Sequence, residues 1–197
     1  DMKKFLLLAM AILCGFASVQ KLSAAAELYA VLSPDKTTVI FYYDEKRSER
    51  SGYTDWQTNI YASNASKITT VTFSSSVDKA RPTTGYHFFY NLYKLTTINY
   101  LNYLHTSDMV SMEGMFYNCS ELTSIYLSTS FTTPKVQTMK SMFDNCRKLE
   151  SLDLSMFNTS NVTNMQSMFS DCWGLKTIKL GYYFYTNNAT DLSSMFY

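Results

Sequence analysis

A dipeptide, Met-Phe, recurs along the second half of the chain at a nearly constant interval. Four of its five copies have their methionines at 115, 142, 168 and 195, in steps of 27, 26 and 27 residues, and the fifth, at Met156, lies outside this series. In three of these copies a cysteine follows four residues after the methionine, at Cys119, Cys146 and Cys172. A fixed period of this length is typical of repeat architectures, in which each copy buries its apolar residues against the next. The chain is therefore expected to fold as a stack of similar turns.

Each copy also carries a short leucine-rich stretch. The pattern Leu-x-x-[Leu/Ile]-x-Leu occurs at residues 122–127, 149–154 and 175–180, and it is typical of the strand of a leucine-rich repeat. Fainter copies begin at Phe88 and Tyr61. We number the resulting repeats 1 to 5, with the boundaries 61–87, 88–114, 115–141, 142–167 and 168–194, and a sixth starting at 195. A solenoid needs a polar cap on its last repeat, and we expect the sequence to continue in a longer protein.

Two faces are expected in every repeat. Alternation in LESLDL points Leu152 and Leu154 inward and Asp153 outward. In NVTNMQSMFSDC the apolar residues return every three or four positions, which predicts a short helix with Asn161 as its N-cap. The predicted fold class is an α/β repeat solenoid with leucine-rich-repeat-like coils of 26–27 residues, each with one parallel strand and one short helix.

The N-terminal part does not repeat. Lys3 and Lys4 precede a short apolar run, and Ala24–Ala26 supplies small residues, so residues 1–26 are predicted to be a signal peptide cleaved after Ala26. Residues 27–60 contain two strand-like stretches around Ser33-Pro34-Asp35-Lys36, because proline favours the second position of a turn. We interpret this segment, with Trp56, as a β-hairpin that caps the solenoid at its N-terminus.

Composition and motifs argue against several functions. The net charge of +1 gives no electrostatic basis for binding nucleic acid. The two histidines, His87 and His105, do not form a metal-binding or nucleophile pair, and no phosphate-binding loop is present. The three repeat cysteines are 26–27 residues apart, which fits no zinc pattern, so we interpret them as small buried residues. The sequence predicts no enzyme, no cofactor and no metal site.

A column of amides is expected at the turn that leads into each strand. It contains Asn64, Asn91, Asn118, Asn145 and Asp171. Asn and Asp side chains commonly hydrogen-bond to nearby backbone groups in turns. We therefore predict a structural ladder here and not a ligand site.

The string MFDNCRKLESLDLSMFNTSNVTNM resembles the repeats of the BspA-like leucine-rich repeat surface proteins, of the type found in Bacteroidota. The resemblance covers about residues 61–197, although repeats 1 and 2 lack the methionine and the cysteine. It implies an exported protein, at the cell surface or secreted, that binds host matrix proteins or other cells. The sequence shows no second apolar span, so contact with a membrane is expected only through the signal peptide before cleavage.

The outward strand positions provide the candidate partner-binding surface, on the concave face. One column varies at every repeat and contains Asn99, Tyr126, Asp153 and Lys179. These four residues are expected to span about 14 Å in one line, at about 4.8 Å per strand. The expected partner is a host extracellular matrix or cell-surface protein, or a glycan. The alternative is a rigid spacer that presents a further C-terminal domain, which could be catalytic.

Overall fold

The computed structural model describes residues 25–54 and 63–197, and this part of the chain is rich in strands. β1 (Glu27–Leu32) and β2 (Thr38–Asp44) form an antiparallel hairpin. The hairpin predicted from the sequence is therefore confirmed. Most of the predicted signal peptide, Trp56 and the first residues of repeat 1 lie outside the described residues, and the domain boundaries stay predictions.

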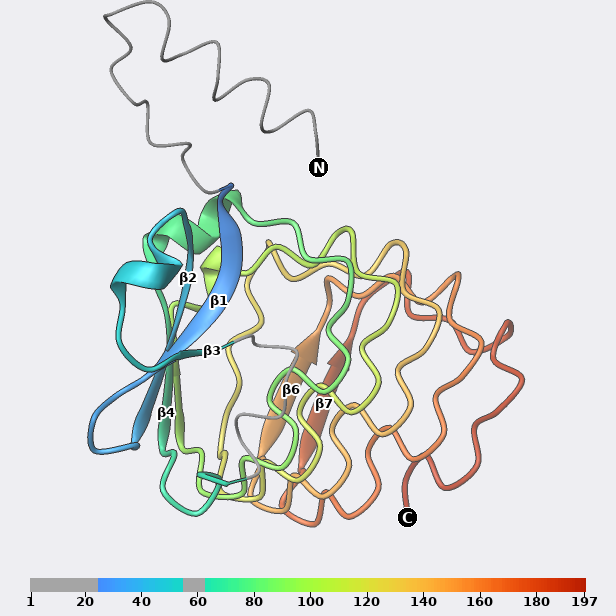
Figure 1. Cartoon of the computed structure of the whole chain (residues 1–197). Helices are drawn as coiled ribbons and strands as arrows, with labels where there is room; N and C mark the ends of the chain where they lie inside the picture. Colours follow the sequence, from blue (N-terminus) through green and yellow to red (C-terminus); the bar gives the residue numbers. More distant parts are fainter. Residues whose placement is uncertain (1–24, 55–62) are drawn as a thin grey trace, which may run out of the picture.

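Parallel strands from successive repeats extend the hairpin sideways. β4 (Thr70–Phe73) pairs with β2, β5 (Thr97–Asn99) pairs with β4, and β3 (Tyr53–Thr54) lies antiparallel to β1 at the other edge. A second sheet joins β6 (Ser151–Leu154) to β7 (Thr177–Leu180) in parallel. Paired residues of neighbouring repeats are 26 or 27 positions apart, which is the period seen in the sequence (Figure 1).

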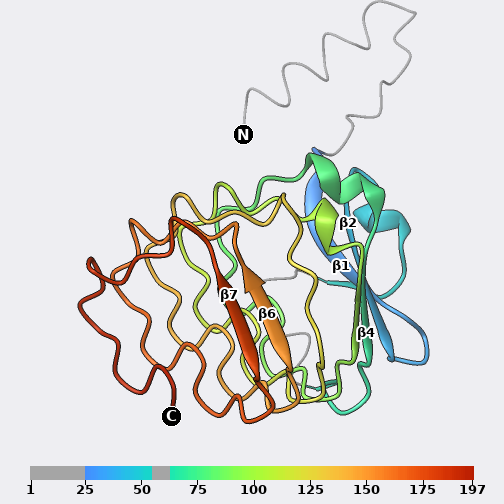
Figure 2. The same ribbon diagram turned by 180° about the vertical axis from the view of Figure 1, so that it is seen from behind.

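The row of strands is interrupted between repeats 2 and 3. Tyr100 follows β5 with a left-handed φ of 58°, and a 3-10 turn, η3 (Leu101–Tyr103), comes next. Within the described chain no ladder joins β5 to repeat 3, and Ser124 of that repeat bridges Ser151 on its other side. Figure 2 shows β6 and β7 apart from β4. The expected continuous line of strands is therefore broken here, and directly after β5 the left-handed Tyr100 turns the chain out of the extended conformation.

The helix predicted for each repeat is also wrong. The described residues contain only 3-10 helices, which are η3, η1 (Arg47–Glu49) and η2 (Ser75–Lys79). In repeat 5 the N–H of Met168 donates to Met165 O three residues back, and the N–H of Phe169 donates to Met195 O of the next turn. Ser167 and Asp171 have left-handed φ angles of 54° and 52°, which no α-helix tolerates. Tight turns, and not an α-helix, therefore place an apolar side chain of this segment in the core about every three residues.

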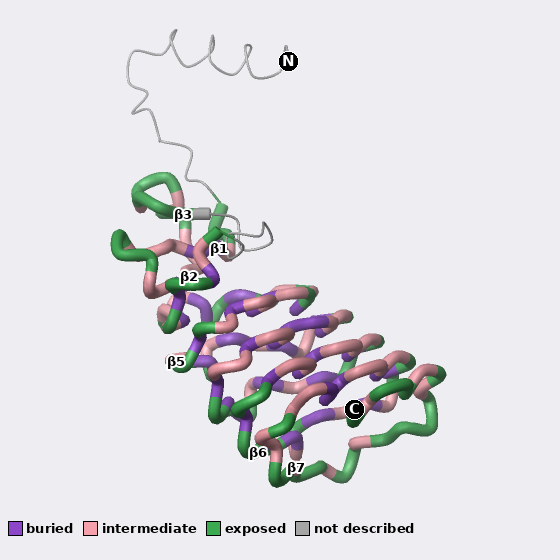
Figure 3. The backbone as a smooth tube through the Cα atoms, turned by 90° about the horizontal axis from the view of Figure 1, so that it is seen from below, coloured by how far each residue is buried: buried purple, intermediate pink, exposed green. Residues whose placement is uncertain are grey.

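A stack of phenylalanine rings runs through the interior. Ring centroids are 4.8 Å apart for Phe89–Phe116, 5.4 Å for Phe116–Phe143 and 5.8 Å for Phe143–Phe169, and all four rings are buried. Such pairs contribute about 0.5–1.5 kcal/mol each beyond the burial of their area. Figure 3 shows the successive turns side by side, with buried lengths in each turn. The repeats therefore form one continuous core.

The hairpin contributes to this core at its N-terminal end. The ring of Phe41, on β2, lies 5.0 Å from that of Phe73 and 4.9 Å from that of Phe88. All three side chains are buried. The hairpin thus covers the apolar side of repeat 1 that has no preceding repeat to pack against.

Candidate functional site

Asp153 and Lys179 are the two candidate residues that the structure brings together. They lie opposite each other on β6 and β7, and Lys179 Nζ donates to Asp153 Oδ2 at 2.9 Å. The other oxygen of Asp153 accepts from the hydroxyl and backbone N–H of Ser155. The hydroxyl bond of Ser155 and then the ammonium of Lys179 lower the pKa of Asp153 to about 2. Both side chains are exposed, and such a pair contributes little to stability.

Asn99 and Tyr126 are placed differently. Asn99 is half-buried on β5, and its amide donates to Thr72 Oγ1 at 3.3 Å in the preceding repeat. Tyr126 lies beyond the interruption of the sheet and is 81% exposed. The predicted column therefore consists of two linked pairs, Thr72–Asn99 and Asp153–Lys179, with the Tyr126 ring between them in sequence order. Whether these residues bind a partner stays a prediction.

The neighbouring outward column is uniform and carries hydroxyls. Thr70 pairs with Thr97, and Ser124 and Thr177 both pair with Ser151. All but Thr70 are exposed. Short hydroxyl side chains suit a parallel ladder because Thr and Ser pack closely across strands.

The amide column forms a ladder, but with different partners from those predicted. Asn118 Nδ2 donates to Asn91 Oδ1 at 2.5 Å, and Asn145 Nδ2 donates to Asn118 Oδ1 at 2.7 Å. The bonds therefore link side chains of successive repeats and not a side chain to its own turn. The φ angles of the three residues are 64°, 54° and 63°. Asn is among the few residues that adopt this left-handed conformation readily.

The three cysteines of the described chain are free, and each thiol points back toward the preceding repeat. Cys119 Sγ donates to Phe89 O at 3.2 Å, Cys146 Sγ to Phe116 O at 3.2 Å and Cys172 Sγ to Phe143 O at 3.0 Å. Burial of the first two is confirmed, whereas Cys172 is only half-buried. Desolvation raises the pKa of all three thiols, that of Cys172 to about 12. They are therefore poor nucleophiles.

A column of buried threonines was not recognised in the sequence. Thr106, Thr133 and Thr159 are fully buried, and each hydroxyl donates to a carbonyl oxygen of the following repeat, at 2.7, 2.9 and 2.7 Å. Their positions are 27 and 26 residues apart, so the same period would have revealed them. A buried hydroxyl needs such a partner, which explains why the column is polar.

Two exposed aromatic residues were also missed as candidates. Tyr100 is 61% exposed at the end of β5, in the register where Leu154 points into the core. Trp173 is exposed in repeat 5, with the guanidinium of Arg147 4.5 Å from its ring centroid. The equivalent positions of the other repeats carry leucine or phenylalanine. A tyrosine at this position is the signal that could have identified Tyr100.

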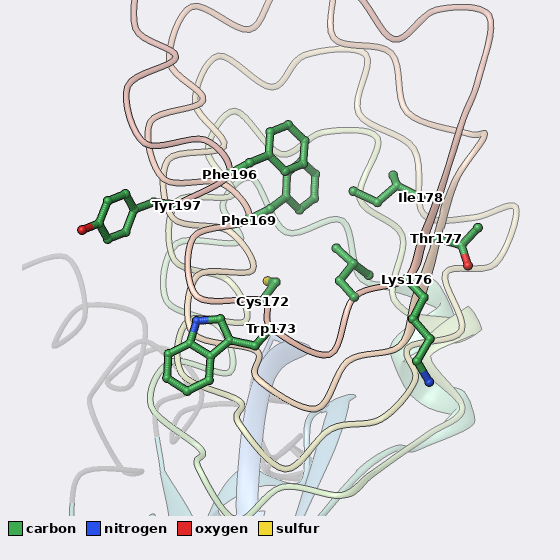
Figure 4. Close-up of a pocket in the computed structure, with 9 residues that line it drawn as sticks. Phe169, Cys172, Trp173, Lys176, Thr177, Ile178, Phe196 and Tyr197 are labelled. Carbon is green, nitrogen blue, oxygen red and sulfur yellow. The ribbon is translucent and has the colours of Figure 1, made fainter.

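A hollow of about 410 Å³ opens beside repeat 5 (Figure 4). Phe169, Cys172 and Ile178 line it, and the ring of Phe196 stacks on Phe169 at 5.1 Å. Lys176 is the charged member of its lining. The apolar lining residues belong to the same columns that the next repeat covers earlier in the chain.

Among residues 25–54 and 63–197, no three or more His, Cys, Asp or Glu side chains gather in a way that could hold a metal ion. Over the same residues, no helix has the length and apolarity needed to cross a membrane.

These features define a repeat protein with a regular buried interior and one variable, exposed sheet face. The chain belongs to the family described as "Mycoplasma protein of unknown function, DUF285", whose model matches residues 85–197, more than half of the sequence. The resemblance found in the sequence is thus supported at the level of a family, and a Bacteroidota type stays a prediction.

No curated protein matches the chain. Among solved structures, the leucine-rich repeat protein TpLRR of T. pallidum is similar at 16% identity, with a TM-score of 0.40, over 76% of this chain and 78% of that one. Similarity of this size does not bear on function.

Proposed function

We propose that this chain is the non-enzymatic binding module of an exported, leucine-rich-repeat-like surface protein with a solenoid fold. The partner is a host extracellular matrix protein, a cell-surface protein or a glycan. The module acts at the cell surface or after secretion, and its role is adhesion. It uses no cofactor.

One observation carries this proposal: side-chain variation is concentrated on the exposed face. The buried columns repeat the same residue types, whereas the outward column changes from Asn99 to Tyr126 to Asp153 to Lys179. Variable side chains on a rigid array are how repeat proteins present binding surfaces. Tyr126 is 81% exposed, and tyrosine supplies a large contact area at low cost in conformational entropy.

The test is attachment of cells that display the full gene product. A triple variant, Tyr126→Ser with Asp153→Ser and Lys179→Ser, should keep its melting temperature and lose most attachment to matrix protein or host cells. The matched control is Val110→Ser with Gln137→Ser and Thr163→Ser, which changes three exposed residues in a line elsewhere on the surface. Equal attachment by the sheet-face variant and the parent would reject the proposal and favour the spacer role.

Export has its own test. The mature protein isolated from its native host should begin at Glu27, since cleavage is expected after Ala26. Intact mass measurement distinguishes this product from a chain that retains Lys3 and Lys4, which would reject the predicted signal peptide.

A further inference from the structure

The apolar columns of the core become exposed at repeat 5. Leu154 is fully buried, whereas Leu180, which pairs with it on β7, is 53% exposed. Phe169 is buried, whereas Phe196, one repeat later, is 68% exposed. The hollow of about 410 Å³ beside repeat 5 is lined by Phe196 and by Ile178 of β7 (Figure 4). A contiguous exposed apolar surface of this kind marks an interaction site.

The repeat before it shows what covers such columns. β7 lies parallel to β6 and brings Leu180 opposite Leu154. It also continues the backbone ladder, since the N–H of Lys176 donates to Glu150 O. On its other edge, β7 pairs with no strand of the described chain. An open strand edge next to apolar pockets is the arrangement by which a sheet accepts an added strand.

Two lysines line this edge, Lys176 directly before β7 and Lys179 within it. Lys176 Nζ lies 3.4 Å from Glu150 Oε2, and Lys179 Nζ lies 2.9 Å from Asp153 Oδ2. Both acids belong to the preceding repeat, and both lysine side chains are largely exposed. An ammonium group has three donors, so one carboxylate does not use them all. A strand added about 4.8 Å away would therefore meet both lysines.

A charged group between two groups of opposite charge already occurs in the stack. Lys148 Nζ, in the next repeat, lies 2.7 Å from Glu121 Oε2. The hydrogen bond from Lys148 and the positive charge of Lys94, in the preceding repeat, lower the pKa of Glu121. The sign of the charge thus alternates over three successive repeats. The same alternation at β7 requires acids on the next strand.

We propose that the outer edge of β7 is a docking site for one more leucine-rich strand, which carries acidic side chains beside Lys176 and Lys179. The occupant is a further repeat, stacked in parallel on repeat 5. Its apolar side chains fill the hollow against Ile178 and Phe196. A second copy of this chain, docked through its own β7, fits less well because lysines would meet lysines. The site is the edge of the sheet, so it is independent of adhesion by the sheet face.

The test is binding of synthetic peptides to the purified chain, measured by fluorescence anisotropy. The probe has the sequence of residues 142–155, which includes the strand of repeat 4 with Glu150 and Asp153. Its matched control is the same peptide with Glu150→Lys and Asp153→Lys. The acidic peptide should bind about fivefold more tightly at low salt. The difference should shrink at high salt, because ions screen exposed charges.

Three variants of the chain separate the charges from the apolar edge. Lys176→Gln with Lys179→Gln should remove the preference for the acidic peptide. Leu180→Asp should abolish binding of both peptides, because it places a charge where an apolar side chain has to pack. Lys148→Gln, which changes an exposed lysine of repeat 4, is the control and should keep both the affinity and the preference. Circular dichroism checks that each variant is folded.

Other results would overturn the proposal. If neither peptide binds, or if both bind the parent chain equally, an acidic strand is not the occupant. A preference that survives in the double glutamine variant would show that the two lysines do not select the strand. Dimers in sedimentation that Leu180→Asp converts to monomers would assign the edge to a second copy of this chain. The cell attachment assay tests the sheet face, so its outcome is separate from all of these.

Discussion

The hydroxyl of Thr133 makes two hydrogen bonds to the backbone of one residue in the next repeat, Asn158. It accepts from the N–H of Asn158 at 2.8 Å and donates to the carbonyl oxygen of Asn158 at 2.9 Å. Thr133 is fully buried, so water cannot replace it. One side chain thus satisfies both polar groups of a peptide segment that belongs to no strand.

Thr133→Val should therefore be strongly destabilising. Valine keeps the shape but removes both hydrogen bonds to the backbone of Asn158, which is half-buried. We expect the free energy of unfolding to fall by about 1–3 kcal/mol in urea denaturation. Thr129→Val, at an exposed position in the same repeat, is the control and should change it little. Equal effects of the two substitutions would show that the hydroxyl of Thr133 is not needed.

The amide ladder predicts an order of stability at Asn118. Both replacements lose its bonds to Asn91 and Asn145, but Asn118→Gly accepts the φ of 54° and Asn118→Ala does not. Alanine should therefore be less stable than glycine by about 1–2 kcal/mol, measured by the same denaturation. If alanine equals or exceeds glycine, backbone strain is not a reason for asparagine in this column.

Thiol accessibility predicts the order of cysteine modification. Iodoacetamide at pH 8 should label Cys172 first, since it is half-buried, and should label Cys119 and Cys146 only in denaturant. Burial raises the pKa of each thiol, so little thiolate is present. Peptide mapping by mass spectrometry distinguishes the sites, and Cys172→Ala should remove the early label. Rapid native labelling of Cys146, or a disulfide between two of the three, would contradict this assignment.

Serine at position 146 is expected to have a mild effect on stability. A buried hydroxyl without a partner would cost about 1–3 kcal/mol, but the carbonyl oxygen of Phe116 is already the acceptor for the Cys146 thiol at 3.2 Å. A hydroxyl can donate to the same atom. The cost of Cys146→Ser should therefore fall below that range, and Cys146→Ala provides the comparison without a donor.

Acid titration tests the contacts of Asp153. Its pKa is lowered to about 2, below the value of about 3.9 usual in an unfolded chain. The carboxylate therefore adds stability above about pH 4, and this is lost as the pH falls toward 2. Ser155→Ala should raise the pKa of Asp153 more than Lys179→Met, because the serine hydroxyl is the larger cause. Carboxyl NMR measures both shifts, and the reverse order would contradict the assignment.

Much of the architecture follows from the sequence because it depends on local chemistry repeated at one period. The spacing of Met-Phe and cysteine gave the 26–27-residue offset at which strands pair in parallel. Alternation in LESLDL correctly placed Leu152 and Leu154 inside and Asp153 outside. Inward and outward positions alternate along any strand, so such a pattern can be interpreted without a partner.

The tertiary structure decided where the hydrogen bonds go. The Met-Phe stretch had the apolar spacing of a helix, but its N–H groups, such as that of Phe169, bond to the next turn, and the left-handed Ser167 stops a helix. The strands likewise divide into two sheets, so Asn99 on β5 and the Asp153–Lys179 pair on β6 and β7 belong to separate ladders. The periodicity of the sequence indicates which side chains are buried. The hydrogen-bond partner of a backbone group often lies in the next repeat, 26–27 positions away. Only the stacked chain brings the two groups into contact.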